Sequence, residues 1–334
     1  TITARAVSPL GVLETVESRA LRYAPGMSLK YTDEISAHPG VFGDGEWLGS
    51  VIDSRDSAAL GFLRHSTLSF PYCLKTYGRA LVVGSGTGTE LQFTLSQGVA
   101  SVTGIEQNGA LLDLLERQYG DSMHTARPAG VRVVVSEARS FLARSTESFD
   151  LIIVPILEGY ISSASGAHAL FENYLFTVEA FRTMLDRLSD DGILVVHGWA
   201  TSPPRGSVKT IALLVEAMRQ QGTSDPSRSL AGIRSWGTFS FLAKKQPLTG
   251  DEIASVKTYS RQNGFDLIYL PGITEEEANR YHRVERPLLY EAAVSILGAN
   301  PGRFFDDYLF DTRPPTDDRP YFSHFVGWKS LPRL

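Results

Sequence analysis

The chain has 334 residues, of which 43% are hydrophobic and 21% charged, a composition typical of an ordinary soluble globular protein. Its formal net charge of −5 argues against nucleic acid as the main partner, because binding phosphates requires a basic face. The single cysteine excludes an intrachain disulfide and a multi-cysteine metal site, and it points to a reducing, cytoplasmic location. We expect no bound metal, because the seven histidines do not cluster at metal-ligand spacing. No apolar stretch reaches the roughly 18 residues needed to span a bilayer, and no signal peptide is visible.

The first segment, residues 1–75, is predicted to form a small β-rich domain. Apolar and polar residues alternate from Val12 to Glu17, as they do in a half-buried strand. The Asp44-Gly45 pair lies between two apolar pairs and indicates a hairpin turn. Apolar residues then recur at roughly helical spacing from Leu60 to Leu74.

Strands and helices alternate in the second segment, residues 76–247, which we expect to be the core domain. This order predicts an α/β fold with a doubly wound parallel sheet and helices on both faces. The last segment, 248–334, is predicted to be a helical extension. Short apolar runs predict strands at 80–83, 102–105, 131–135, 151–154, 193–197 and 238–243. Helices are expected at 90–95, 111–119, 173–188, 208–221, 251–263 and 287–297.

The loop Gly84-Ser85-Gly86-Thr87-Gly88 joins the first core strand to its helix. Glycines let the backbone turn tightly and approach a ligand closely, and the helix start adds unpaired N–H groups. In the dinucleotide fingerprint the third glycine would fall at Thr89, so the observed spacing favours a mononucleoside such as S-adenosylmethionine over NAD. A glycine loop that serves packing alone is the alternative interpretation.

Acidic residues follow the next two strands. Glu106, with Gln107 after it, ends the second strand, where a carboxylate can accept hydrogen bonds from both ribose hydroxyls. Glu137 and Ala138 follow the third strand, where an acidic side chain and the next N–H are expected to read the adenine edge. A helix N-cap explains Glu137 equally well. These four residues and the glycine loop are the predicted cofactor-binding set.

Three longer strings carry a resemblance to a known family. They are Leu21–Gly26 (LRYAPG), Glu172–Phe181 (ENYLFTVEAF) and Thr316–Phe322 (TDDRPYF). On these strings the chain resembles the spermidine synthase (polyamine aminopropyltransferase) family, and most closely the soluble region of bacterial spermidine synthase-like proteins. The resemblance implies an N-terminal β domain, a Rossmann-like class I S-adenosylmethionine-dependent transferase core and a homodimer. Many such proteins carry membrane helices before this region, which leaves open attachment to a membrane through a segment absent from this chain.

The chain departs from the family pattern in the half of the site where transfer occurs. The family's D-S-x-D-P motif, whose first Asp deprotonates the attacking amine, corresponds to Pro155–Gly159, and Pro155 cannot accept a proton. The Asp of the family's G-G-G-D-G-G loop, which holds the aminopropyl amine, is replaced by Thr87. Leu48 replaces the glutamine of the family's D-G-x-x-Q motif. Of the family's Tyr-His pair, this chain keeps only the histidine, His65.

Six residues are candidates for this half of the site. Glu158, Tyr160 and His65 are the expected catalytic residues, with Glu158 orienting or deprotonating the acceptor. The candidate substrate residues are Glu172, Asp317 and Asp318. The two aspartates reach the site only if the C-terminal segment folds back. The alternative for them is a capped turn with a local ion pair.

Three functions remain open at this stage. The first is a transferase that uses S-adenosylmethionine or its decarboxylated form as co-substrate and alkylates a small-molecule amine. The second is a methyltransferase that uses the same cofactor site. The third is a non-catalytic nucleoside-binding module, which the missing base at Pro155 favours.

Overall fold

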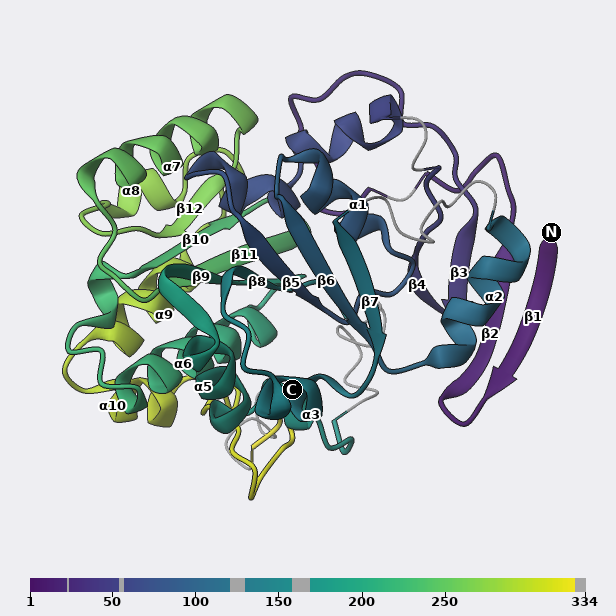
Figure 1. Ribbon diagram of the computed structural model, residues 1–334. Coiled ribbons are helices and arrows are strands. Elements are labelled where there is room, and N and C mark those ends of the chain that lie inside the picture. Colours follow the sequence, from purple (N-terminus) through teal and green to yellow (C-terminus); the bar gives the residue numbers. More distant parts are fainter. Residues whose placement is uncertain (23, 54–56, 121–129, 158–168, 328–334) are drawn as a thin grey trace.

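The computed structural model describes residues 1–22, 24–53, 57–120, 130–157 and 169–327 (Figure 1). Within these ranges the chain forms a four-stranded sheet and an eight-stranded sheet. Helices cover both faces of the larger sheet, and the smaller sheet lies beside it with the N-terminus at its outer edge (Figure 1). None of the helices in the described part of the chain is long and apolar enough to cross a membrane.

The N-terminal sheet is an antiparallel meander, as expected for a β-rich domain. Its hairpin turn lies at Asp44 and Gly45, which both have positive φ angles, 48° and 82°. Such angles suit a two-residue hairpin loop, so the predicted turn is confirmed. In chain and spatial order the strands are β1 (Ile2–Ser8), β2 (Gly11–Val16), β3 (Gly40–Gly43) and β4 (Glu46–Ser50).

The eight-stranded sheet is mixed, with the order β12-β10-β11-β9-β8-β5-β6-β7. Its neighbours from β9 to β7 pair in parallel, as predicted. The prediction of a wholly parallel sheet is wrong at the other end, because β11 is antiparallel to both β9 and β10. Three residues join β10 to β11, too few for the crossover that a parallel pair requires. The strands are β5 (Arg79–Val83), β6 (Ser101–Glu106), β7 (Val131–Val135), β8 (Phe149–Val154), β9 (Leu188–Trp199), β10 (Leu230–Arg234), β11 (Thr238–Lys244) and β12 (Asp266–Tyr269).

Alternate residues of β5 serve two separate cores. Leu81 and Val83 are fully buried on the face covered by α5, α6 and α9. Ala80 and Val82 are buried on the opposite face, against η2, α1 and α7. A strand buried on both sides reads as a continuous apolar run, which is why this one was visible in the sequence. The covering helices are η2 (Thr67–Cys73), α1 (Thr89–Ser96), α5 (Val178–Asp186), α6 (Gly206–Gln220), α7 (Gly250–Asn263) and α9 (Leu288–Leu297).

Several predicted elements have different limits. The helix expected over 173–188 begins only at α5, because Thr177 caps it by accepting the Ala180 N–H, and η3 (Tyr174–Phe176) precedes it. The helical spacing from Leu60 to Leu74 belongs to two 3₁₀ helices, η1 (Ser57–His65) and η2. The remaining helices are α2 (Gly109–Tyr119), α3 (Ala138–Arg144), η4 (Pro226–Arg228), α8 (Glu275–Ala278) and α10 (Pro301–Asp307).

The segment after residue 247 is more than a helical extension. Its strand β12 pairs with β10 and becomes an edge of the main sheet. Its helices α7 and α9 cover opposite faces of that sheet (Figure 1). The segment predicted to be helical therefore also contains one strand. The domain boundaries after residues 75 and 247 stay predictions.

Candidate functional site

The glycine loop turns sharply at the carboxyl end of β5. Gly84, Gly86 and Gly88 have φ angles of 77°, 53° and 84°, a region that favours glycine. The N–H groups of Gly84 and Ser85 both donate to the carbonyl oxygen of Ile105, at 2.9 and 2.8 Å. Gly88 is the N-cap of α1 and offers no capping side chain to the first helical amides. The predicted strand, loop, helix and second strand are therefore present in the expected order.

Glu106 lies directly beside this loop. Its Oε2 accepts the N–H of Gly86 at 2.9 Å, and its Oε1 accepts the N–H of Asn108 at 2.8 Å. The side chain is buried, whereas Gln107 next to it is exposed. Each carboxylate oxygen has a second lone pair, so Glu106 retains acceptor capacity for hydroxyl groups.

Glu137 is the N-cap of α3. Its carboxylate accepts the N–H groups of Arg139 and Ser140, each at 2.8 Å. Burial raises the pKa of Glu137, but these backbone hydrogen bonds outweigh burial and leave its pKa below the ordinary value. The helix-cap interpretation is confirmed, and an adenine contact from Glu137 or from the half-buried Ala138 stays a prediction.

The β3–β4 hairpin covers the glycine loop. Thr89, the first residue of α1, donates its hydroxyl to the carbonyl oxygen of Ser50 at 2.8 Å. The backbone of Gly49 lies so close that a Cβ added there would be 2.6 Å from Thr87 Oγ1. The N-terminal sheet and the core domain therefore meet directly above the loop.

A cavity of about 120 Å³ lies between the hairpin and the glycine loop. Leu48, Thr87 and Pro155, three of the positions that depart from the family pattern, all line it. They come from β4, the loop and the segment after β8, so only the fold brings them together. The full lining is Pro25, Trp47, Leu48, Gly49, Ser50, Ile52, Phe62, Leu63, Leu68, Gly84, Ser85, Gly86, Thr87, Thr89, Glu90, Pro155 and Ile156.

Glu90 is the residue of this cavity that sequence reasoning missed. It lies in the first turn of α1 with 8% of its surface exposed, and its Oε1 is buried with no hydrogen-bond partner among the described residues. Burial raises the pKa of its carboxyl group to about 8. Acidic residues are common in a first helical turn because they complement the helix dipole, so nothing in the sequence separated Glu90 from an ordinary helix start.

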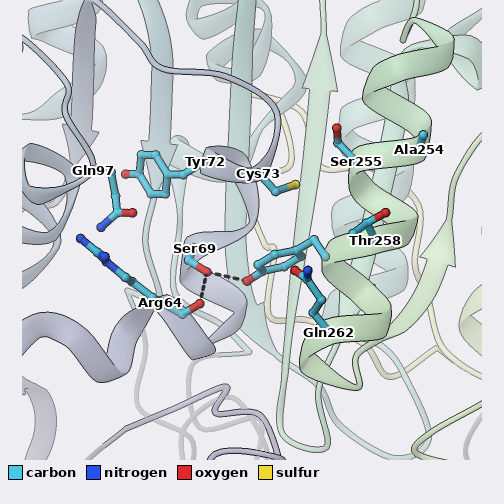
Figure 2. A pocket seen from close by; sticks show the side chains of 10 residues that line it. Arg64, Ser69, Tyr72, Cys73, Gln97, Ala254, Ser255, Thr258 and Gln262 are labelled. Atoms are coloured by element: carbon cyan, nitrogen blue, oxygen red, sulfur yellow. Dashed lines mark hydrogen bonds between the residues drawn. The ribbon is translucent and has the colours of Figure 1, made fainter.

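A larger cavity, of about 520 Å³, lies between η2 and α7 (Figure 2). None of the predicted site residues lines it. Its Ser69 hydroxyl donates to the carbonyl oxygen of Arg64 at 2.8 Å and also forms a hydrogen bond with the Tyr259 hydroxyl. Burial raises the pKa of the Cys73 thiol in its wall to about 12, which leaves the thiol unreactive near neutral pH. We assign no chemistry to this cavity.

Of the three predicted catalytic residues, His65 is the one that falls within the described residues. Glu158 and Tyr160 lie outside the described residues. His65 ends η1, and its exposed ring lies 5.0 Å from the ring of Tyr31, measured between centroids. His65 is not in the lining of the cavity under the hairpin.

The C-terminal segment does fold back onto the core. Asp317 forms two hydrogen bonds with the Arg139 guanidinium, at 2.8 and 2.7 Å, and accepts a third from the Thr177 hydroxyl at 2.7 Å. The predicted turn exists, since the N–H of Arg319 donates to the carbonyl oxygen of Thr316, but the ion pair of Asp317 is with Arg139 rather than local. Asp318 is exposed.

Glu172 belongs to the same surface as Asp317. It accepts hydrogen bonds from the hydroxyl groups of Tyr174 and Tyr321, at 3.1 and 3.4 Å. Neither Glu172 nor Asp317 lines the cavity under the hairpin, so a role for them in substrate binding stays a prediction. Within the described residues no cluster of three histidine, cysteine or acidic side chains is arranged to hold a metal ion.

Curated proteins with related sequences are aminopropyltransferases by name. The chain is 23% identical to a probable polyamine aminopropyl transferase of Bifidobacterium longum over 259 residues, which cover 74% of this chain and 52% of that protein. It is 25% identical to a polyamine aminopropyltransferase of Synechococcus over 187 residues, covering 52% of this chain and 55% of that protein. The chain thus spans about half the length of these relatives. No family model matches it.

Solved structures with the same fold include spermidine synthases. The one from Thermotoga maritima superposes with a TM-score of 0.51 and 15% identity over 87% of each chain. A probable spermidine synthase from Corynebacterium glutamicum gives a TM-score of 0.51 and 16% identity over 86% of this chain and 96% of that chain. These likenesses confirm the Rossmann-like core with a small N-terminal sheet.

Proposed function

We propose that this chain, which belongs to the spermidine synthase family, transfers an alkyl group from S-adenosylmethionine or its decarboxylated form to a small-molecule amine. The observation that carries the proposal is the glycine loop, which Glu106 holds from one side and the β3–β4 hairpin covers from the other. The names of the curated relatives support aminopropyl as the transferred group.

The nucleoside would lie along the carboxyl ends of the parallel strands, the usual ligand position in such sheets. Gly84 and Gly86 allow the ligand to approach the backbone, and the free lone pairs of Glu106 would accept the ribose hydroxyls. The sulfonium end would then point into the cavity under the hairpin, between Thr87 and Pro155.

The proposed reaction is a direct displacement. The lone pair of the neutral acceptor amine attacks the carbon beside the sulfonium, the C–S bond breaks, and its electron pair stays on sulfur. If the 3-aminopropyl group moves, the sulfur leaves as methylthioadenosine and the new ammonium loses one proton. Such a step depends mainly on alignment of the amine with the C–S bond, which the cavity walls would supply.

Pro155 offers no proton acceptor at this point, so another group must take the acceptor's proton. The sequence offers Glu158 as the candidate for this proton acceptor, and Glu158 lies outside the described residues. The expected homodimer, cytoplasmic location and absence of a nucleic-acid partner belong to the same proposal. Light scattering during gel filtration would test the dimer.

Product analysis tests the function. The purified chain is incubated with each sulfonium donor and a linear diamine, and the nucleoside products are identified by mass spectrometry. We expect methylthioadenosine to form together with an alkylated amine. S-adenosylhomocysteine instead would indicate methyl transfer, and the absence of both products would contradict an alkyl transfer to diamines.

A further inference from the structure

We infer that Glu90 is the group that receives a primary ammonium of the substrate in the cavity under the β3–β4 hairpin. This inference deepens the proposed function and rests on it, because it assigns the cationic end of a ligand whose nucleoside end lies at the glycine loop. It concerns a residue that none of the motifs in the sequence singled out.

The composition of the cavity wall makes Glu90 distinctive. Most of the lining is glycine backbone, proline and apolar side chains, with hydroxyl groups from the loop and the start of α1. Glu90 is the one ionisable side chain in the described lining. A cationic ligand that enters this cavity therefore meets a single described side chain that can take up a complementary charge.

One oxygen of the Glu90 carboxyl group also has no internal partner among the described residues. Buried polar atoms in proteins nearly always form hydrogen bonds, because leaving them unpaired is costly. Glu90 Oε1 is buried and has no partner in the described part of the chain. A ligand ammonium, with three N–H donors, would satisfy it and neutralise its charge.

The neighbouring titratable groups do not compensate Glu90. Burial, and then the Glu90 carboxyl itself, raises the pKa of the Tyr72 phenol, so Tyr72 stays neutral near pH 8. Both oxygens of Glu106 already accept backbone N–H groups of the loop. The described titratable side chains on the elements packed against α1 are Glu46 of β4, Arg64 and His65 of η1, Tyr72 and Cys73 of η2, Arg79 of β5 and Glu106 of β6.

Proton exchange follows from this environment. With a pKa of about 8, the Glu90 carboxyl is mostly protonated at pH 7. An arriving ammonium favours the carboxylate, so the carboxyl proton passes to solvent and a buried ion pair forms. Binding of an ammonium ligand at pH 7 should then release close to one proton.

Two molecules could supply the ammonium. One source is the aminopropyl arm of decarboxylated S-adenosylmethionine, and the other is the acceptor diamine. The chemistry that Glu90 recognises, an alkylammonium, is the same for both. Methylthioadenosine has the nucleoside and the sulfur but no ammonium, so it separates recognition of the nucleoside from recognition of the charge.

The test is calorimetric titration at pH 7 in two buffers that differ in ionisation enthalpy, which yields affinity and proton release together. The ligands are methylthioadenosine, decarboxylated S-adenosylmethionine, and 1,4-diaminobutane added to the methylthioadenosine complex. We expect proton release with at least one ammonium ligand and none with methylthioadenosine. In Glu90→Gln that release should vanish and affinity for the same ligand should fall at least about tenfold, while methylthioadenosine binds as before.

Each contrary outcome has a distinct meaning. If both ammonium ligands bind Glu90→Gln as they bind the unaltered chain, the assignment of Glu90 is overturned while the nucleoside site stands. If methylthioadenosine fails to bind the unaltered chain, the proposed function falls and this inference falls with it.

Two further variants exclude a folding artefact. Glu116→Gln removes an exposed carboxyl from α2 and should change none of these measurements. Glu90→Asp keeps the charge but shortens the side chain, so it should retain proton release at reduced affinity. Glu90→Gln should unfold like the unaltered chain below about pH 4 and become the more stable of the two as the pH rises from 4.5 to 8, because the unfolded chain ionises this carboxyl in that range while burial keeps it protonated in the folded chain.

Discussion

Both carboxylate oxygens of Glu106 accept backbone N–H groups, one from the glycine loop and one from the turn after β6. The same carboxylate can therefore hold the loop in shape and accept ribose hydroxyls with its remaining lone pairs. Glu137 differs from it, because its two oxygens cap α3 at an exposed position. At the scale of single residues, the nucleoside half of the site depends on Glu106 more than on Glu137.

Replacing Glu106 with alanine should weaken nucleoside binding by about 1–3 kcal/mol, the usual effect of losing hydrogen bonds to a charged acceptor. Calorimetric titration with methylthioadenosine measures this directly. Glu106→Gln keeps one acceptor oxygen and should lose less affinity. Unchanged affinity in Glu106→Ala would remove Glu106 from the binding site.

At the scale of secondary-structure elements, the contact between the β3–β4 hairpin and the glycine loop shapes the site. The N-terminal sheet and the core domain meet there, through the close approach of Gly49 to Thr87 and through the hydrogen bond from Thr89 to Ser50. Because the cavity lies between these elements, a change that separates them should alter the cavity without touching the nucleoside end.

Gly49→Ala is expected to lower the stability of the chain by about 1–3 kcal/mol, because the new methyl group would overlap the Thr87 side chain. Thermal unfolding measures the loss, and adding Thr87→Ala, which removes the overlapping atoms, should restore part of it. Gly61→Ala is the matched control, since nothing lies within 4 Å of a Cβ added there. Equal unfolding temperatures for all these variants would contradict the tight contact.

Elements with a strong local pattern were predictable from the sequence, and elements that depend on distant partners were not. The unit from β5 to β6 was visible because a buried parallel strand, a glycine loop and a helix are all encoded locally. The short strands β10 and β12 escaped, because four or five residues show little periodicity and their pairing is with each other and with β11. Glu90 escaped for a related reason, since the cavity that it lines is also walled by residues such as Pro25, Trp47 and Phe62, which lie far from it in the sequence.

On the scale of the whole molecule, the C-terminal segment ties the last part of the chain to the core domain. The N–H of Val178 donates to the carbonyl oxygen of Pro315, and Asp317 pairs with Arg139 at the start of α3. The sequence alone indicated that this string was distinctive but left open whether it folds back. Contacts across 178 positions, as between Arg139 and Asp317, cannot be read from local patterns.

Asp317→Asn should lower the free energy of unfolding at pH 7 by about 1 kcal/mol or less, because the ion pair is only partly shielded from solvent. The Arg139 guanidinium holds the pKa of Asp317 below its ordinary value, so this stabilisation is complete at neutral pH. It should begin to shrink below about pH 4 and disappear as the pH falls through the lowered pKa. Denaturant unfolding against pH provides the measurement.

Asp318→Asn is the control for this pair, since Asp318 is exposed and forms no ion pair among the described residues. It should unfold like the unaltered chain at every pH. A difference between Asp317→Asn and the unaltered chain that persists unchanged at pH 2 would show that the ion pair is not its source.

The central claim is that this chain holds a nucleoside at its glycine loop, and titration calorimetry with S-adenosylmethionine, its decarboxylated form and methylthioadenosine tests it most directly. Our account predicts saturable binding of at least methylthioadenosine, weakened by Glu106→Ala and unaffected by Glu116→Ala. If none of the three compounds binds, the loop has only a packing role and the account is contradicted.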